Sequence, residues 1–585
     1  MNDKTSTKDG YLYLVSRLHE MLFDYSIDIY RVPLLCTPLL GYEFLETERE
    51  IRHGNSIPVK RLEPIKEELV SSFDKDEIVK EILSHEERTY VRRMLVSVDN
   101  TRVLEGCRYL RGKIPLTRYY DTLIQELKRA ASAPKEKKRL EGMLRKLPAI
   151  LHFRGYSHEY LYYVFNGIDF STVKSSQLES KLDELLDNFD FHSKKFDVYF
   201  AFNVSESSNA KLVDEIEKLF DGLKVIEFDQ DDRFKEQKEH LISHGSYASD
   251  EIEIRVCRIE IESLDAYTAA KSASDLFDFG TRSFLLLLNE SAPACLSECL
   301  VVERGNNKEA FPECRIQNYK LLKPRPALRE KLVKQSHRSL AILFNRTHGG
   351  AEFDRLTKAI DLHNSSLTIN NFQNSFLCLW TALEVVCNGG KTITQSLRTA
   401  LELSYLSRVI EEIEQRLSRS CLTYLNDISD KHDISLNETI YSILFLSDWK
   451  SERESLYERL SGDPLTRNRC FIINSLSKGS KMFEHIQAYG KRVSWHIERM
   501  NRARNSIVHA GDMPLFLDSL GEHLHMYLDI LMNMILSYFE SGDYHYIEDI
   551  LAAMGYEHEI YFNKLKRANL ADYYELQWFI ARQTV

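Results

Sequence analysis

The sequence predicts a mainly α fold, in which a helical N-terminal region and a C-terminal helical bundle flank a small α/β (α+β) block. Composition is the first reason: the 585 residues include 23 Gly and 13 Pro, below their average usage of about 7% and 5%, so the chain has few obligatory turns. Periodicity is the second, because apolar residues recur every three or four positions at both ends of the chain, as on one face of a helix. The length allows roughly three or four domains of about 100–200 residues each.

Residues 1–185 are predicted to form the helical N-terminal region. Apolar residues follow the helical spacing in Leu12–Leu22 and again in Ile78–Leu95. Near the end of this region, residues 128–146 carry eight basic and two acidic side chains. The segment is either a solvated helical face or a patch that contacts RNA phosphates, in which case the substrate-binding residues are Lys135, Lys137, Lys138 and Arg139.

Residues 186–320 are predicted to form the α/β block, a sensor or regulatory domain. Strand-like segments at Phe196–Val204 and Leu223–Phe228 flank the helical pattern of Asp214–Phe220, so we expect a strand, helix, strand unit in a partly parallel sheet. In Glu251–Glu262 the alternation of apolar residues slips by one position, which predicts a β-bulge. The block contains no GxGxxG and no Walker A loop, so no nucleotide-phosphate cradle is expected.

The basic, proline-containing segment Lys320–Arg338 marks a predicted boundary or hinge, after which residues 340–585 form a helical domain. The formal net charge of −11 argues against a general nucleic-acid coat protein but leaves room for a local basic patch. No stretch approaches about 18 consecutive apolar residues and the first residues are polar, so neither a membrane span nor a secretory signal is expected. The ten cysteines form no CxxC pair, which is typical of reduced thiols. We therefore expect a cytoplasmic protein.

Residues 366–388 are predicted to form a core helix that ends at Gly389 and Gly390. Glu384 follows Trp380 by four residues and so projects from the edge of the apolar face. A lone carboxylate is costly there without a partner. The alternative is that Glu384 is a rim residue in contact with water.

A second apolar stripe is predicted in residues 481–511, at Met482, Ile486, Tyr489, Val493, Ile497 and Met500. Continuing this rhythm puts Arg504 on the buried stripe, and a buried guanidinium requires a carboxylate, a phosphate or an interface partner. Asn505 and His509 lie four residues apart and share a helix face. Arg502 also shares a face with His509, so helical geometry leaves open which arginine is the functional cation.

An arginine, an amide and an imidazole together suit one reaction especially well, the attack of an RNA 2′-hydroxyl on the adjacent phosphodiester. Histidine titrates near neutral pH and can transfer the proton. Arginine can hold two phosphate oxygens and stabilise the charge that develops there, while asparagine orients the substrate. This reaction needs no metal and no other cofactor. The sequence also has no HExxH motif and no compact His/Asp/Glu cluster of the kind that metallonucleases use.

The segment Arg504–His509, R-N-S-I-V-H, resembles the R-N-x-x-x-H signature of HEPN ribonucleases. It follows Trp495 and Arg499 and precedes Gly511, and an upstream helix contains WTALE. In this wider context the segment is most similar to the Apea-like branch found in bacterial conflict systems. The resemblance covers about residues 340–560 and does not extend to the first 340. Met500 and Asn501 stand where relatives often carry an Ile-Tyr pair, which affects packing near the site more than its chemistry.

The resemblance implies a helical bundle that forms a homodimer, in which two motifs face one cleft. It also implies metal-independent endoribonuclease activity that leaves a 2′,3′-cyclic phosphate and a 5′-hydroxyl. Arg504 is then expected to stabilise the phosphate, His509 to transfer the proton and Asn505 to orient the substrate. Glu384 is expected to fix Arg504, and Arg502 is a second supporting residue.

By the same analogy, the expected substrate is tRNA or mRNA and the expected role is anti-phage defence by abortive infection. The N-terminal region would then sense a phage-derived trigger or restrain the nuclease. Two alternatives stay open. One is a catalytically inactive HEPN-like module that binds RNA or mediates dimerisation, and the other is a metal-dependent nuclease in the α/β block.

Overall fold

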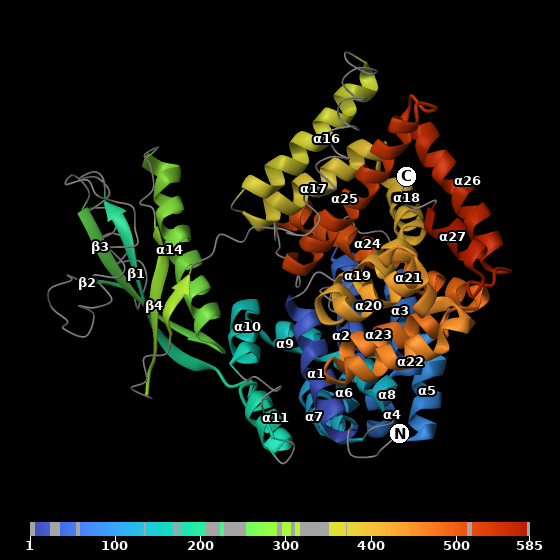
Figure 1. Cartoon of the computed structure of the whole chain (residues 1–585). Coiled ribbons are helices and arrows are strands. Elements are labelled where there is room, and N and C mark those ends of the chain that lie inside the picture. Colours follow the sequence, from blue (N-terminus) through green and yellow to red (C-terminus); the bar gives the residue numbers. More distant parts are fainter. Residues whose placement is uncertain are drawn as a thin grey trace. The chain divides into compact units, whose positions relative to one another are not determined.

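A computed structural model shows a mainly α protein, as predicted (Figure 1). The structure describes residues 6–23, 35–53, 59–133, 136–167, 173–174, 177–204, 223–226, 253–288, 295–305, 311–315, 350–369, 371–511 and 517–581. Contacts divide the chain into two compact units. The first comprises Met1–Ile150, Phe170–Leu182 and Lys320–Val585, and the second comprises Leu151–Asp169 and Asp183–Tyr319. No described helix combines the length and the hydropathy that a membrane span requires.

The second unit contains a five-stranded sheet with the strand order β2-β3-β1-β4-β5. Its strands are β1 (Lys194–Val204), β2 (Leu223–Ile226), β3 (Glu253–Ser263), β4 (Cys295–Glu303) and β5 (Phe311–Arg315). Helix α14 (Ala266–Leu288) runs along the sheet and packs against it (Figure 1), and α10 (His158–Asn166) packs against α14. Helices α9 (Leu147–Arg154) and α11 (Leu178–Leu186) each cross the division between the two units.

The prediction of a partly parallel sheet is wrong. Strands β1 and β2 do run in the same direction, because each pairs antiparallel with β3. Since β3 lies between them, every described pair of neighbouring strands is antiparallel. The helix predicted at residues 214–220 lies outside the described residues. The predicted bulge is also misplaced, because β3 pairs with β1 without a break, whereas the register of β1 against β4 shifts between Phe200 and Phe202.

The first unit begins with a group of short helices. They are α1 (Ser6–Phe23), α2 (Thr37–Arg52), the 3-10 turn η2 (Val59–Arg61), α3 (Leu62–Lys75), α4 (Glu77–Ile82), α5 (His85–Leu95), α6 (Asn100–Lys113), α7 (Leu116–Ser132) and α8 (Lys137–Leu144). The run predicted from Ile78 to Leu95 is two helices, because Ser84 starts a new one. Its hydroxyl accepts a hydrogen bond from the Glu87 backbone while the Glu87 carboxylate accepts one from the Ser84 N–H.

The C-terminal helices complete the first unit. They are α16 (Ala351–Thr368), α17 (Phe372–Val386), α18 (Gly390–Leu403), α19 (Tyr405–Ser420), α20 (Leu422–His432), α21 (Leu436–Phe445), α22 (Lys450–Arg459), α23 (Pro464–Ser475), α24 (Gly479–Ala510), α25 (Leu517–Ser541), α26 (Ile547–Leu565) and α27 (Tyr573–Ala581), with short 3-10 turns at Ser447–Trp449 and Leu460–Gly462. The predicted core helix is α17, and it starts later than expected because Asn371 caps it by accepting a hydrogen bond from the Asn374 backbone at 3.0 Å.

The N-terminal and C-terminal helices belong to one compact unit, although the sequence suggested separate regions at 1–185 and 340–585. Helix α1 packs on α23, and α3 packs on α24. At the first of these contacts the carboxylate of Glu20 is fully buried and bonds to Arg416 at 2.6 Å and Arg469 at 3.1 Å, as well as to Arg17 of its own helix. The two ends of the chain therefore share buried ion pairs. The predicted hinge at 320–338 lies outside the described residues.

Candidate functional site

The R-N-x-x-x-H segment occupies the last two turns of α24. This helix packs against α3, α17, α18, α25 and α26, so its orientation is fixed from several sides. Gly511 follows it with φ +68°, and its N–H donates to the Ile507 carbonyl at 3.2 Å. Glycine adopts this left-handed conformation without the steric cost that a Cβ imposes. The helix therefore ends directly after the motif.

The buried stripe of α24 does not pass through Arg504. Residues Met482 to Met500 of the predicted stripe are buried, but the stripe continues through Ala503 and Ile507, and the Arg504 side chain is 30% exposed. Steps of three and four alternate along such a face, so either position 503 or position 504 can follow Met500. Only the packing of the folded chain decides between them. Arg504 is thus at the edge of the apolar face, where solvent reaches its guanidinium.

Arg504 meets the carboxylate that the sequence suggested for it. Its Nη2 atom lies 3.7 Å from Oε1 of Glu384 on α17, and Nη1 donates to Asn505 Oδ1 at 3.1 Å. Trp380 Nε1 in turn donates to Glu384 Oε1 at 2.9 Å, which holds the carboxylate in place. The structure therefore brings Glu384, Arg504 and Asn505 together at the contact between α17 and α24.

His509 lies one turn beyond Asn505, at the end of α24, and its side chain is exposed. The amide of Asn505 is directed back along the helix, where it donates to Asn501 at 3.4 Å. The neighbouring residue Val508 is also exposed, at 48%. The end of the helix thus presents the imidazole to solvent.

Arg502 has a different environment from Arg504. It is buried and donates to Glu43 of α2 at 2.7 Å. One turn earlier, the buried Arg499 donates to Glu43 at 2.8 and 2.9 Å and to Glu68 of α3 at 2.7 Å. Arg502 is therefore part of an ion-pair cluster that connects α24 to the N-terminal helices, and we call these four residues the α24 clamp. Of the two arginines considered from the sequence, Arg504 is the accessible one.

The charges of the α24 clamp shift the pKa of its members in opposite directions. Burial raises the pKa of Glu43, but Arg499 and Arg502 outweigh burial and hold it at about 2. Burial raises the pKa of Glu68, and the nearby charge of Glu43 adds to this, so its pKa stays above the ordinary value despite Arg499. Burial lowers the pKa of Arg499, but the two carboxylates outweigh burial, so the pKa lies above its ordinary value. Glu43 therefore stays ionised at neutral pH.

The predicted basic patch is largely neutralised by acidic neighbours. Arg139 lies within ion-pair distance of Glu81, Glu126 and Glu136, and Lys137 lies 3.9 Å from Asp9. Lys138 is exposed, and Lys135 lies outside the described residues. These contacts favour the first interpretation of residues 128–146, a solvated helical face, over a phosphate-binding surface.

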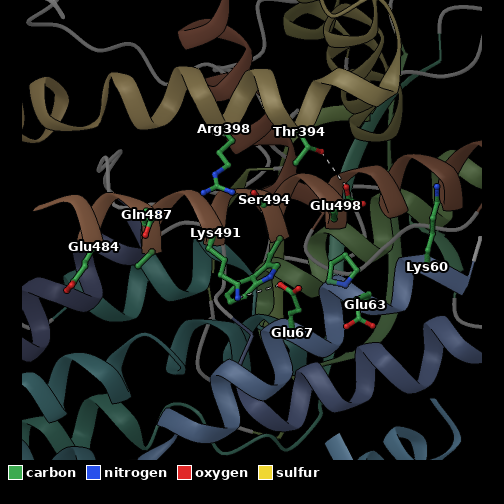
Figure 2. Close-up of a pocket in the computed structure, with 13 residues that line it drawn as sticks. Lys60, Glu63, Glu67, Thr394, Arg398, Glu484, Gln487, Lys491, Ser494 and Glu498 are labelled. Atoms are coloured by element: carbon green, nitrogen blue, oxygen red, sulfur yellow. Dashed lines mark hydrogen bonds and ion pairs between the residues drawn. The ribbon is translucent and has the colours of Figure 1, made fainter. Parts of the chain in front are cut away.

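A cleft of about 780 Å³ lies between α3, α18 and the middle of α24. Figure 2 shows Arg398 of α18 directed toward α24, with Lys491 and Glu67 facing each other below it. Three cationic side chains and four carboxylates line the cleft. Some of them pair with each other, as Lys491 does with Glu67 at 3.6 Å. The cleft therefore offers no surplus positive charge to a phosphate backbone.

The fold also assembles a polar group that was not predicted from the sequence. His363 of α16 meets His525 and Asp529 of α25, and 166 residues separate the first from the last. The local signal was the four-residue spacing of His525 and Asp529, which puts both on one helix face. His523, two positions before His525, lies on another face of α25 and is buried beside His496 and Tyr527.

Searches of protein-family models, curated proteins and solved structures give no match for this chain.

Proposed function

We propose that the protein is a metal-independent endoribonuclease whose active site is centred on Arg504, Asn505 and His509. The observation that carries the proposal is the arrangement at the end of α24, where an accessible arginine lies beside an amide and the amide lies one turn from an exposed imidazole. The resemblance of this segment to the HEPN signature supports the same chemistry. Glu384, 3.7 Å from Arg504, acts as a positioning residue.

In the proposed reaction, the 2′-oxygen of the RNA attacks phosphorus and the bond to the 5′-oxygen breaks. The proton leaves the 2′-hydroxyl for a base, and an acid returns a proton to the departing 5′-oxygen. Arg504 stabilises the charge on the phosphate oxygens, as a guanidinium does through paired hydrogen bonds. An imidazole suits both proton transfers because it gains and loses a proton near neutral pH.

A homodimer follows from the same proposal. The reaction needs one base and one acid, and each chain carries one such histidine at the end of α24. Two copies that face each other through this end supply both groups, and the exposure of Val508 and His509 fits such a contact. The cleavage rate per chain should then rise with protein concentration, because a larger fraction of the chains is dimeric. The substrate class, tRNA or mRNA, the phage-derived trigger, the cytoplasmic location and the role in abortive defence belong to the proposal by analogy.

The test uses the full chain, with labelled tRNA and mRNA in the presence of EDTA. We expect wild-type protein to produce fragments with 2′,3′-cyclic phosphate and 5′-hydroxyl ends. Arg504→Ala and His509→Ala should produce none, whereas His545→Ala, which removes an exposed histidine away from the motif, should cleave like wild type. Circular dichroism confirms that each variant is folded.

Equal cleavage by wild type and the two motif variants would exclude this active site. If wild type leaves RNA intact but binds it, and His509→Ala changes neither property, the chain is the inactive HEPN-like binding module instead. If wild type and both motif variants cleave RNA equally without EDTA and none of them cleaves it with EDTA, the activity belongs to a metal-dependent nuclease elsewhere in the chain.

A further inference from the structure

Two imidazoles and one carboxylate converge between α16 and α25, and we call them the His-Asp cluster. His363 Nε2 lies 3.0 Å from Asp529 Oδ1, and His525 Nε2 lies 3.8 Å from Asp529 Oδ2. The two imidazole rings are stacked with their centroids 4.7 Å apart. Each oxygen of the carboxylate thus faces a different imidazole, and one candidate ligand atom from each residue lies within 4.8 Å of the other two.

These separations suit a shared divalent ion. Zinc bonds to histidine nitrogen and carboxylate oxygen at about 2.0–2.2 Å, so two ligand atoms on one such ion stand roughly 3–3.5 Å apart. The separations of 3.0 and 3.8 Å bracket that range, and the ligand atoms of the two histidines lie within 4.8 Å of each other. His525 and Asp529 are one helical turn apart, so α25 presents both ligands on the same face without distortion.

A hydrogen bond to the carboxylate accounts for one of the two imidazoles only. His363 lies at hydrogen-bond distance from the carboxylate, at 3.0 Å, whereas Nε2 of His525, whose ring stacks on it at 4.7 Å, lies 3.8 Å from the other carboxylate oxygen. A divalent cation instead binds both rings in their neutral form and is partly balanced by the carboxylate. Two imidazoles and a carboxylate are a ligand set that transition metals favour over Mg²⁺ or Ca²⁺.

Exposure leaves room for the rest of the coordination shell. The side chains of His363 and His525 are 24% and 12% exposed, and that of Asp529 is 44% exposed. The cluster is therefore half-buried on the imidazole side and more open to water at the carboxylate, so an ion can enter and water can complete its shell.

We propose that His363, His525 and Asp529 bind one divalent transition-metal ion of the Zn²⁺ class, which links α16 to α25. The ligands come from two helices that are far apart in sequence, so the bound ion stabilises the folded C-terminal bundle. The inference is independent of the proposed nuclease chemistry, whose residues lie on α17 and α24.

The test is titration of the EDTA-treated, gel-filtered full-length protein with Zn²⁺, followed by calorimetry and thermal unfolding, and with Co²⁺, followed by its visible absorption. We expect saturable binding of one ion per chain and a higher Tm. His525→Ala and Asp529→Asn should weaken binding by at least about 100-fold, because loss of even an outer-shell partner typically costs about 10- to 100-fold. His545→Ala is the matched control and should bind like wild type.

Asp529→Asn removes a charge from a partly exposed position and keeps the size of the side chain, so it should keep the fold and serves as the second variant if His525→Ala is unstable. The proposal is overturned if wild type shows no saturable Zn²⁺ binding, or if both ligand variants bind Zn²⁺ and gain Tm as wild type does. Since the readouts are binding and unfolding, the result does not depend on whether the protein cleaves RNA.

Discussion

Single positions on α24 decide whether a charged side chain holds the fold together or remains available to a ligand. Arg502 and Arg504 are two residues apart, yet Arg502 is buried against Glu43 while Arg504 is 30% exposed beside Glu384. A turn of 3.6 residues puts them on different sides of the helix. The Arg502 pair is inside the protein and the Arg504 pair is at its surface, so only Arg504 can exchange its carboxylate for a phosphate at low cost.

At the residue scale, Glu384→Gln should affect catalysis more than stability. A partly exposed ion pair contributes about 0–1 kcal/mol to stability, and the amide oxygen that replaces the carboxylate can still accept the Trp380 hydrogen bond of 2.9 Å. Arg504 loses the charge that orients it, so we expect kcat for RNA cleavage to fall between about 10- and 100-fold, with a smaller change in KM. Thermal unfolding and steady-state cleavage measure the two effects. An unchanged kcat would remove Glu384 from the site.

At the scale of elements, α24 connects the two ends of the first unit, because among the described helices it contacts the N-terminal helix α3 as well as α17, α18, α25 and α26. Buried ion pairs of this kind fix the position of a helix, since breaking one leaves an uncompensated charge in the interior. The α24 clamp lies within two turns of the motif. A substitution in the α24 clamp should therefore alter the position of the end of α24, where the motif lies.

The clamp predicts a pH dependence of stability that Glu43→Gln should remove. The pKa of Glu43 is about 2 in the folded protein against an ordinary 4.5, so its contribution is complete above 4.5 and is lost as the pH falls toward 2. Near neutral pH the variant should be less stable than wild type. The difference should shrink as the pH falls below 4.5, because a protonated Glu43 and the glutamine that replaces it are both uncharged.

Urea unfolding at several pH values between about 6 and 3 measures this difference. Glu63→Gln, which changes an exposed carboxylate on α3, is the control and should follow wild type. Glu68 does not account for the effect, because its pKa is raised and its protonation opposes the loss of stability on acidification. A gap between wild type and Glu43→Gln that stays constant with pH would contradict the assignment.

The contact between α24 and α26 gives a second prediction at this scale. A Cβ on Gly479 would lie 2.0 Å from the Leu565 carbonyl oxygen and 2.6 Å from that of Ala568, so Gly479→Ala must separate the two helices. We expect a loss of about 1–3 kcal/mol. Gly555→Ala, in α26 with nothing within 4 Å, should gain roughly 0.5–1 kcal/mol from helix propensity. Chemical unfolding of both variants is the measurement, and equal effects would contradict the close approach.

Local sequence patterns predicted where the helices lie better than they predicted which side chains and strands pair in the folded protein. The buried stripe of α24 and the glycine that ends it are visible in the sequence because both depend on neighbouring residues. The pairing of Glu384 with Arg504 was expected from the family resemblance of the sequence, not from a local pattern. The partners of Arg499 and Arg502 are more than 400 positions away, as no local pattern can indicate. The antiparallel sheet was missed for the same reason, since β3 enters between β1 and β2 from later in the chain.

At the scale of the whole molecule, the chain ends are interdependent. Glu20 on α1 binds Arg416 and Arg469, and the clamp joins α2 and α3 to α24. The first unit therefore includes both the N-terminal helices and the helix that carries the motif. If the N-terminal helices restrain or activate a nuclease, the α24 clamp gives them a direct path to it, because Arg499 and Arg502 lie within two turns of Arg504.

This arrangement predicts that a fragment of residues 340–585 does not fold stably alone. It would lack the helices α1 and α3 that pack on α23 and α24, so apolar surface that these helices cover would be exposed at about 25 cal/mol per Å². Arg469, Arg499 and Arg502 would also lose Glu20, Glu43 and Glu68, against a total stability of about 5–15 kcal/mol. We expect the fragment to lack a cooperative unfolding transition and to exchange its amide hydrogens rapidly. Co-expression with residues 1–182 should restore both properties, because it returns Glu20, Glu43 and Glu68. A fragment that unfolds as cooperatively as the full chain would show that the two ends are separate domains.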